Sequence, residues 1–139
     1  MVLPDGGIGI LHPIYIDDVV TGILEAARHG RIGEVYILAG DESVTVREFF
    51  GKYAEMLGLR DLRSAPSWMV MTIATLSEWA SKLTGKPPRY TRTAVRVITR
   101  RTSYRCNKAR KELGFKPVVS FEVGMEKIRH WLQTSNLRN

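Results

Sequence analysis

The sequence has 139 residues, of which 44% are hydrophobic and 25% charged, and its formal net charge is +7. This length and apolar content suit a single domain over residues 1–139. The one cysteine excludes an intrachain disulfide and any zinc site built from several cysteines. No run approaches the roughly 20 apolar residues that span a bilayer. We therefore expect a cytoplasmic protein with no membrane partner.

The first predicted elements are a short strand and a capped helix. Residues 1–13 are rich in glycine and proline and are expected to be irregular. Residues 14–16 (IYI) favour a strand. Asp17 or Asp18 is then expected to cap a helix that ends near His29. Paired carboxylates also suit acid–base chemistry, but capping is the better-supported interpretation at a helix start.

Two further elements follow. Residues 34–39 (EVYILA) are almost entirely apolar, which predicts a strand covered on both faces, as in a parallel sheet. Thr45 and Glu48 have the spacing of a capping box, which predicts a helix that begins after Thr45 and ends before Gly58.

A long apolar helix is predicted over about 67–83. It is apolar around too much of its circumference to have one face in water. We therefore expect it to be buried on two sides or to form an interface. Three more helices are predicted, over 91–99, from Asn107 to Leu113, and after a Ser120 cap. Phe115 is expected to fold back after Gly114.

Basic residues are concentrated in one stretch. Ten of them, and no acid, lie between Lys86 and Lys111. Arg92 and Arg96 share a helix face that suits a phosphate or carboxylate of a substrate, although a solvated basic face is the plainer interpretation. The stretch also attracts nucleic acid. Aromatic residues are sparse there and no helix-turn-helix or zinc pattern accompanies it, so we do not expect nucleic acid as a partner.

Three blocks of sequence occur in an order typical of one enzyme family. They are HPIYIDDVV at 12–20, EVYILAG with VTVRE at 34–48, and NKARKELGFKP with SFE and WL at 107–132. On these blocks the sequence resembles the C-terminal, substrate-binding part of the NAD-dependent epimerases and dehydratases of the extended short-chain dehydrogenase/reductase class. Val123 departs from the family, which often has an acid there, and only the helix cap is affected.

The resemblance implies an α/β fold that is α+β in isolation, mostly helical with a few short strands, corresponding to the C-terminal lobe of a Rossmann-fold enzyme. It also places His12 and Tyr15 where the family's chain approaches the substrate. A loop histidine and a packed tyrosine are the plainer interpretation. With Arg92 and Arg96, these residues are the predicted substrate contacts.

Two motifs of the family are not matched. No G-x-x-G-x-x-G turn follows a strand, and the cluster Gly6-Gly7-Ile8-Gly9 lacks its spacing. The catalytic Tyr-x-x-x-Lys spacing is met only by Tyr104 and Lys108, with the expected cap Asn107 between them. We therefore expect no catalytic residue, no metal site, and no NAD or NADP bound by this chain alone, although the family uses one of these cofactors.

The predicted function is a substrate-binding part of an NAD(P)-dependent oxidoreductase or epimerase that is not catalytic alone. Its small-molecule substrate would be a sugar nucleotide or a hydroxy/keto compound of flavonoid or steroid type. A dinucleotide-binding partner or a second copy would cover the strand at 34–39 and the helix at 67–83. A nucleic-acid-binding module and a self-associating scaffold are the alternatives.

Overall fold

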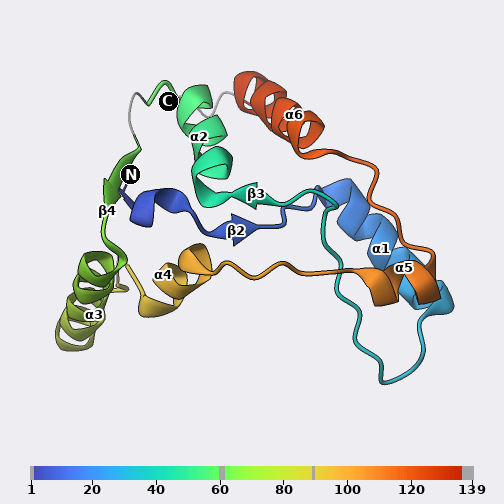
Figure 1. Cartoon of the computed structure of the whole chain (residues 1–139), viewed down its shortest axis with the longest axis horizontal. Helices are drawn as coiled ribbons and strands as arrows, with labels where there is room; N and C mark the ends of the chain where they lie inside the picture. Colours follow the sequence, from blue (N-terminus) through green and yellow to red (C-terminus); the bar gives the residue numbers. More distant parts are fainter. Residues whose placement is uncertain (1, 60–61, 89, 136–139) are drawn as a thin grey trace. The chain divides into compact units, whose positions relative to one another are not determined.

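The computed structural model describes residues 2–59, 62–88 and 90–135, and helices joined by short strands and loops dominate these residues (Figure 1). The chain divides into two compact units. Unit 1 comprises residues 1–11 and 44–102, and unit 2 comprises residues 12–43 and 103–139. The predicted fold class, mostly helical with a few short strands, is confirmed.

Unit 1 contains all of the strands found in the described residues. β1 (Val2–Pro4) pairs in parallel with β4 (Arg63–Ala65), and β2 (Ile10–Leu11) pairs antiparallel with β3 (Val44–Thr45). A 3-10 turn, η1 (Asp5–Gly7), joins β1 to β2. The expectation that residues 1–13 are irregular is therefore wrong for residues 2–7 and 10–11. The partner strands come much later in the chain, and a local pattern does not reveal them.

One buried cluster of unit 1 lies between two helices. α3 (Ser67–Thr84) packs on α4 (Arg92–Thr99) through Val70, Ala74 and Val95. A salt bridge joins the same helices, because Arg92 Nε donates to Glu78 Oε2 at 2.7 Å. These contacts occupy one side of α3.

The predicted capping box begins α2 (Val46–Met56) and is confirmed. Thr45 Oγ1 accepts a hydrogen bond from the Glu48 amide at 3.1 Å, and Glu48 Oε2 accepts one from the Thr45 amide at 2.7 Å. Both amides belong to the first turn, where no helical acceptor is available. Val46, the first residue of the helix, is fully buried, so the cap fixes a residue of the core.

We expect Thr45→Ala to lower the free energy of unfolding by about 1 kcal/mol, because the Glu48 amide loses its acceptor. Urea denaturation measures the change. Thr93→Ala, at an exposed position in the first turn of α4, is the matched control and should change the value by less than about 0.5 kcal/mol. An unfolding midpoint of Thr45→Ala equal to that of the parent would contradict the role of the cap.

Unit 2 contains α1 (Ile16–His29), α5 (Asn107–Leu113) and α6 (Phe121–Thr134). α5 ends at Gly114, whose φ of 68° is left-handed, and the chain turns there to bury Phe115 as predicted. Ser120 caps α6, also as predicted. The core of this unit consists of Cys106, Ala109, Leu113 and Phe115, with Ile14, Ala26, Tyr36 and Leu38 packed against it.

The predicted strands at 14–16 and 34–39 do not form in the described structure. Ile16 already belongs to α1, and Tyr15 is its N-cap. Along 34–39, Val35 and Ile37 are 77% and 48% exposed, whereas their neighbours Tyr36 and Leu38 pack on the core. A strand requires a neighbour to complete its ladder of hydrogen bonds, and no described segment supplies one to residues 34–39. The apolar run therefore has one covered face and one exposed face.

Candidate functional site

Asp18 is a buried carboxylate that ties two distant segments of unit 2 together. Its Oδ1 accepts from the Val118 amide at 3.1 Å and its Oδ2 from the Val119 amide at 3.0 Å, and the residue is only 2% exposed. The prediction that Asp17 or Asp18 caps α1 is wrong, since the N-cap is Tyr15 and no side chain caps it. The carboxylate of Asp18 instead accepts hydrogen bonds from the backbone amides of residues 118–119, which do not belong to a strand.

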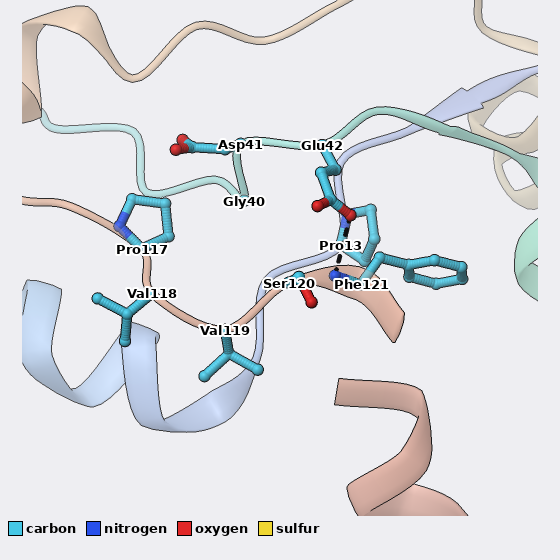
Figure 2. Close-up of a pocket in the computed structure, with 9 residues that line it drawn as sticks. All are labelled: Pro13, Gly40, Asp41, Glu42, Pro117, Val118, Val119, Ser120 and Phe121. Atoms are coloured by element: carbon cyan, nitrogen blue, oxygen red, sulfur yellow. Dashed lines mark hydrogen bonds between the residues drawn. The ribbon is translucent and has the colours of Figure 1, made fainter. Parts of the chain in front are cut away.

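This junction borders a small pocket in unit 2 (Figure 2). Pro13, residues 40–42 and residues 117–121 line about 190 Å³ of space. Gly40 permits the close approach of the chain segments, because a Cβ at this position would overlap the carbonyl oxygen of Pro13.

The polar groups of the pocket already have partners. Figure 2 shows Glu42 pointing toward the start of α6, where its Oε2 accepts from the Phe121 amide at 3.0 Å. Asp41 forms a salt bridge with Arg110. The volume is also below the roughly 300–1,000 Å³ of small-molecule sites. The pocket is therefore a space between packed loops of unit 2, and it does not indicate a substrate site.

His12, a predicted substrate contact, has a shielded imidazole. Both ring nitrogens are shielded from solvent and have no hydrogen-bond partner among the described residues. The ring meets that of Tyr104 edge to face, with 6.4 Å between the centroids. A shielded polar group without a hydrogen bond costs about 1–3 kcal/mol. A bound molecule would reach these nitrogens only if the side chains that shield them moved, and the substrate contact of His12 stays a prediction.

Tyr15, the second predicted contact in unit 2, has packing partners. The Lys127 ammonium lies 4.6 Å from its ring centroid, and a Cβ on Gly124 would come within 3.3 Å of the ring. Gly124 thus leaves room for the aromatic ring beside α6. These contacts give Tyr15 a structural role, and its substrate contact remains a prediction.

Arg92 and Arg96, the other predicted contacts, lie in unit 1 on α4. Besides the salt bridge, Glu78 Oε1 accepts from the Arg92 amide at 2.8 Å, and this bond holds the pKa of Glu78 below its usual range. An anionic ligand at Arg92 would have to compete with Glu78. Arg96 is exposed, so it is the better candidate for an anionic group, and both remain predictions.

The basic stretch 86–111 is less available to nucleic acid than its sequence suggests. Lys108 Nζ lies 2.5 Å from Glu34 Oε2, and Arg110 pairs with Asp41. With Arg92, at least three basic residues in the described part of this stretch have carboxylate partners. The stretch is also divided between the two units. These pairs disfavour the nucleic-acid-binding alternative, since a phosphate would compete with a carboxylate for each of these three side chains.

Tyr104 and Lys108 do not have the geometry of a catalytic pair on one helix. Tyr104 precedes α5, which begins at Asn107, so Tyr104 and Lys108 do not share a helix. The expectation that Asn107 caps this helix is wrong, because the N-cap is Cys106 and no side chain caps it. The Lys108 ammonium pairs with Glu34 and lies 4.7 Å from the ring centroid of Tyr36. Among the described residues, no group of histidine, cysteine and acidic side chains could hold a metal ion.

The glycines at 6–9 do not fit a dinucleotide cradle. A Cβ on Gly7 would lie 2.8 Å from Leu3 Cδ1 and 2.9 Å from the Arg47 amide nitrogen, and one on Gly9 would overlap the carbonyl oxygen of Ile98. These glycines therefore permit close packing within unit 1. A pyrophosphate cradle instead requires glycines whose amides face the ligand.

A network of ion pairs and hydrogen bonds links residues 31–36 to α5. Arg31 Nη2 donates to Glu112 Oε1 at 2.6 Å, and the Tyr36 hydroxyl donates to Glu112 Oε2 at 2.9 Å. The bond from Arg31 is the main reason that the pKa of Glu112 is held below its usual value of 4.5. Lys108 lowers the pKa of Glu34 in the same way. No local pattern in the sequence indicates this network, because its members are far apart in the chain.

We expect Glu112→Gln to weaken the dependence of stability on acid pH. The depressed pKa means that the stabilisation is present above about pH 4.5 and is lost as the pH falls through the folded-state pKa. Urea midpoints measured between about pH 7 and pH 3 test this. Glu126→Gln, whose carboxylate is largely exposed on α6, is the control. Equal acid sensitivity of the parent and Glu112→Gln would contradict the expectation.

No protein-family model matches the chain. Among curated proteins, it is 27% identical over 138 residues to the uncharacterized protein YbjS of Escherichia coli, which covers 96% of this chain and 41% of that protein. It is 29% identical over 128 residues to the 4-hydroxy-2-methyl-3-oxo-4-farnesyl-3,4-dihydroquinoline-1-oxide ketoreductase of Stigmatella aurantiaca, with 90% and 38% coverage. It is 32% identical over 100 residues to the 3beta-hydroxysteroid-dehydrogenase/decarboxylase isoform 1 of Arabidopsis thaliana, with 68% and 23% coverage. The chain thus spans about two fifths of the first two relatives.

Solved structures match nearly the whole chain. WbmF of Bordetella bronchiseptica, in complex with NAD+ and UDP, covers 98% of this chain and 32% of its own, with a TM-score of 0.61 and 25% identity. UDP-glucose 4-epimerase of Thermotoga maritima, with UDP-glucose, covers 97% and 35%, with a TM-score of 0.65 and 21% identity, and shows the fold alone. The resemblance predicted from the sequence is confirmed.

Proposed function

We propose that this chain, which corresponds to the C-terminal part of an NAD-dependent epimerase/dehydratase of the extended short-chain dehydrogenase/reductase family, is the substrate-binding part of an NAD(P)-dependent oxidoreductase or epimerase. In this proposal it is not catalytic alone. Gly7 and Gly9 are packed within unit 1, and Tyr104 and Lys108 do not share a helix. A dinucleotide-binding half therefore supplies the cofactor and the reacting groups.

The observation that carries the proposal is the exposed apolar surface of unit 2. α1 buries Asp18 and Gly22 but exposes the large apolar side chains Ile16, Val20, Ile23 and Leu24. Val35 and Ile37 are exposed as well. Large exposed apolar surfaces usually mark an interaction site. About three fifths of the length of the first two relatives lies outside the matched region. We assign to this unmatched part the surface that covers these side chains.

The relatives favour a hydroxy or keto compound as the substrate. Two of them are named as a ketoreductase and a hydroxysteroid dehydrogenase, and both names describe chemistry at a carbon–oxygen bond. His12 and Tyr15 are the proposed contacts in unit 2. A sugar nucleotide is the alternative, supported by the UDP of the WbmF complex, and Arg96 would then be the better placed of the two predicted arginines for its phosphates.

Titration calorimetry with NAD and with NADP tests the division of roles. We expect no binding by this chain, although a dissociation constant near a micromolar, about −8 kcal/mol, is easily measured. WbmF, titrated with NAD+ under the same conditions, is the positive control. Micromolar binding of either cofactor to this chain would contradict the proposal.

The same surface favours association of two copies when no partner half is present. We expect light scattering over a concentration series to show a dimer that dissociates on dilution. Val35→Glu should shift the dissociation to higher concentration, because it places a charge on the exposed face of residues 34–39. Val123→Glu, at an exposed valine on α6, is the control. A parent that stays monomeric at the highest concentration would contradict this expectation.

A further inference from the structure

Unit 1 has an exposed apolar surface of its own, on α3. Trp68 and Trp79 are each 68% exposed and Leu83 is 85% exposed. The exposed large apolar side chains of this helix are Trp68, Met69, Ile73, Leu76, Trp79 and Leu83. The sequence predicts a helix that is buried on two sides or forms an interface, and the structure buries only one side.

These six side chains form one continuous face. At 3.6 residues per turn they fall within less than half of the helix circumference, together with Thr72 and Ala80. The opposite side carries Val70 and Ala74, which pack on α4. Glu78, the only acid of α3, lies outside the exposed face and pairs with Arg92. The exposed face therefore carries no charge.

The charge of the surrounding unit is strongly positive. Unit 1 has eleven lysines and arginines against five acids, a formal charge of +6 out of the +7 of the whole chain. Lys82 lies beside Trp68 and Trp79 around the helix, Lys86 follows the helix, and both are exposed. Two such units would repel each other if their α3 faces met. An anionic surface would attract them.

We propose that the exposed face of α3 binds the surface of an anionic lipid membrane. The tryptophans are suited to the boundary between lipid and water, where an apolar ring and a polar N–H are both accommodated. Lysines next to them pair with lipid phosphates. Among the described helices, none combines the length and apolarity needed to cross a bilayer, so α3 lies on the surface. The expectation of no membrane partner came from the lack of a spanning segment and does not apply to such a helix.

This proposal rests on α3 and the charge of unit 1, and it holds whether or not the chain binds a substrate as proposed above. A membrane-bound face would also keep unit 1 close to molecules dissolved in the lipid. The expected binding is reversible, because one helix face buries only the side chains named above.

Flotation with lipid vesicles tests the proposal on the 139-residue chain. We expect binding to phosphatidylcholine vesicles that contain about 30% phosphatidylglycerol, and weaker binding to pure phosphatidylcholine or at high salt. In a Trp131→Phe background, the emission of the remaining tryptophans should shift to shorter wavelength on binding. The double variant Leu76→Gln, Leu83→Gln should bind at least about tenfold more weakly.

The double variant Val118→Gln, Val123→Gln, which changes two exposed valines of unit 2, is the matched control and should bind like the parent. Circular dichroism verifies that both variants keep their helices. The proposal is overturned if the parent does not float with anionic vesicles, or if the α3 variant binds as well as the control. It is also overturned if the α3 face instead holds two copies together, seen as a dimer in lipid-free buffer that the α3 variant abolishes.

Discussion

Phe115→Ala should lower the free energy of unfolding by about 4 kcal/mol. Phe115 is 1% exposed and lies at the centre of the unit 2 core with Leu113 and Ala109. It also limits the space beside Gly22 of α1, where a Cβ would lie 3.1 Å from its ring. Removing the ring leaves a cavity against three segments of the unit. Single domains are stable by only about 5–15 kcal/mol, so the variant should be close to unfolding.

Urea denaturation at neutral pH measures this loss. Phe115→Leu, which keeps most of the apolar volume, should cost less than about 1.5 kcal/mol. Trp131→Ala, at an exposed position on α6, controls for the loss of an aromatic ring at the surface. If Phe115→Ala and Trp131→Ala cost the same, Phe115 would not be the centre of the core.

Asp18→Ala should cost about 3 kcal/mol, because the Val118 and Val119 amides lose a charged acceptor. Asp17→Ala is the matched control. Its carboxylate lies one residue earlier, is 64% exposed and pairs with Lys127 at 3.1 Å, so its removal should cost less than about 1 kcal/mol.

Hydrogen exchange gives this prediction a local readout. In Asp18→Ala the amides of Val118 and Val119 should exchange much faster than in the parent, and in Asp17→Ala they should not. Similar exchange at these amides in both variants would contradict the role of Asp18.

The elements that the sequence predicts well depend on residues close together in the chain. Thr45 and Glu48 form the capping box, and Gly114 turns the chain to bury Phe115. In both cases the residues that make the contact lie within a turn or two of each other. N-terminal helix caps and the glycines that end helices can therefore be predicted without knowledge of the tertiary structure.

The cap expected at Asp17 or Asp18 of α1 is wrong, and the large apolar residues of this helix, such as Val20 and Leu24, are exposed. The buried face instead carries Asp18 and Gly22, four residues apart. Periodicity identifies an apolar stripe but does not say what covers it. The signal for this buried face in the sequence is the small residue Gly22, one helical turn after Asp18. Gly22 leaves room for Leu38 and Phe115.

The remaining features depend on long-range partners. Val118 and Val119 follow Asp18 by about a hundred residues, and no local pattern links them. The strand predicted at 34–39 needs a neighbour, which the described residues do not supply. His12, Tyr15, Arg92 and Arg96 stay predictions as substrate contacts.

The most direct test of the central claim replaces the matched third of WbmF with this chain and compares the chimera with the chain alone. We expect the chimera to bind NAD+, and we expect the pair Val35→Glu, Ile37→Glu to lower its unfolding midpoint far more than that of the isolated chain. In the chimera these side chains would be covered by the dinucleotide-binding half, and a buried unpaired carboxylate is costly. The pair Val118→Glu, Val123→Glu should act alike in both proteins. Equal effects of the Val35 and Ile37 changes in the chimera and the isolated chain would contradict the claim that this face binds a dinucleotide-binding half.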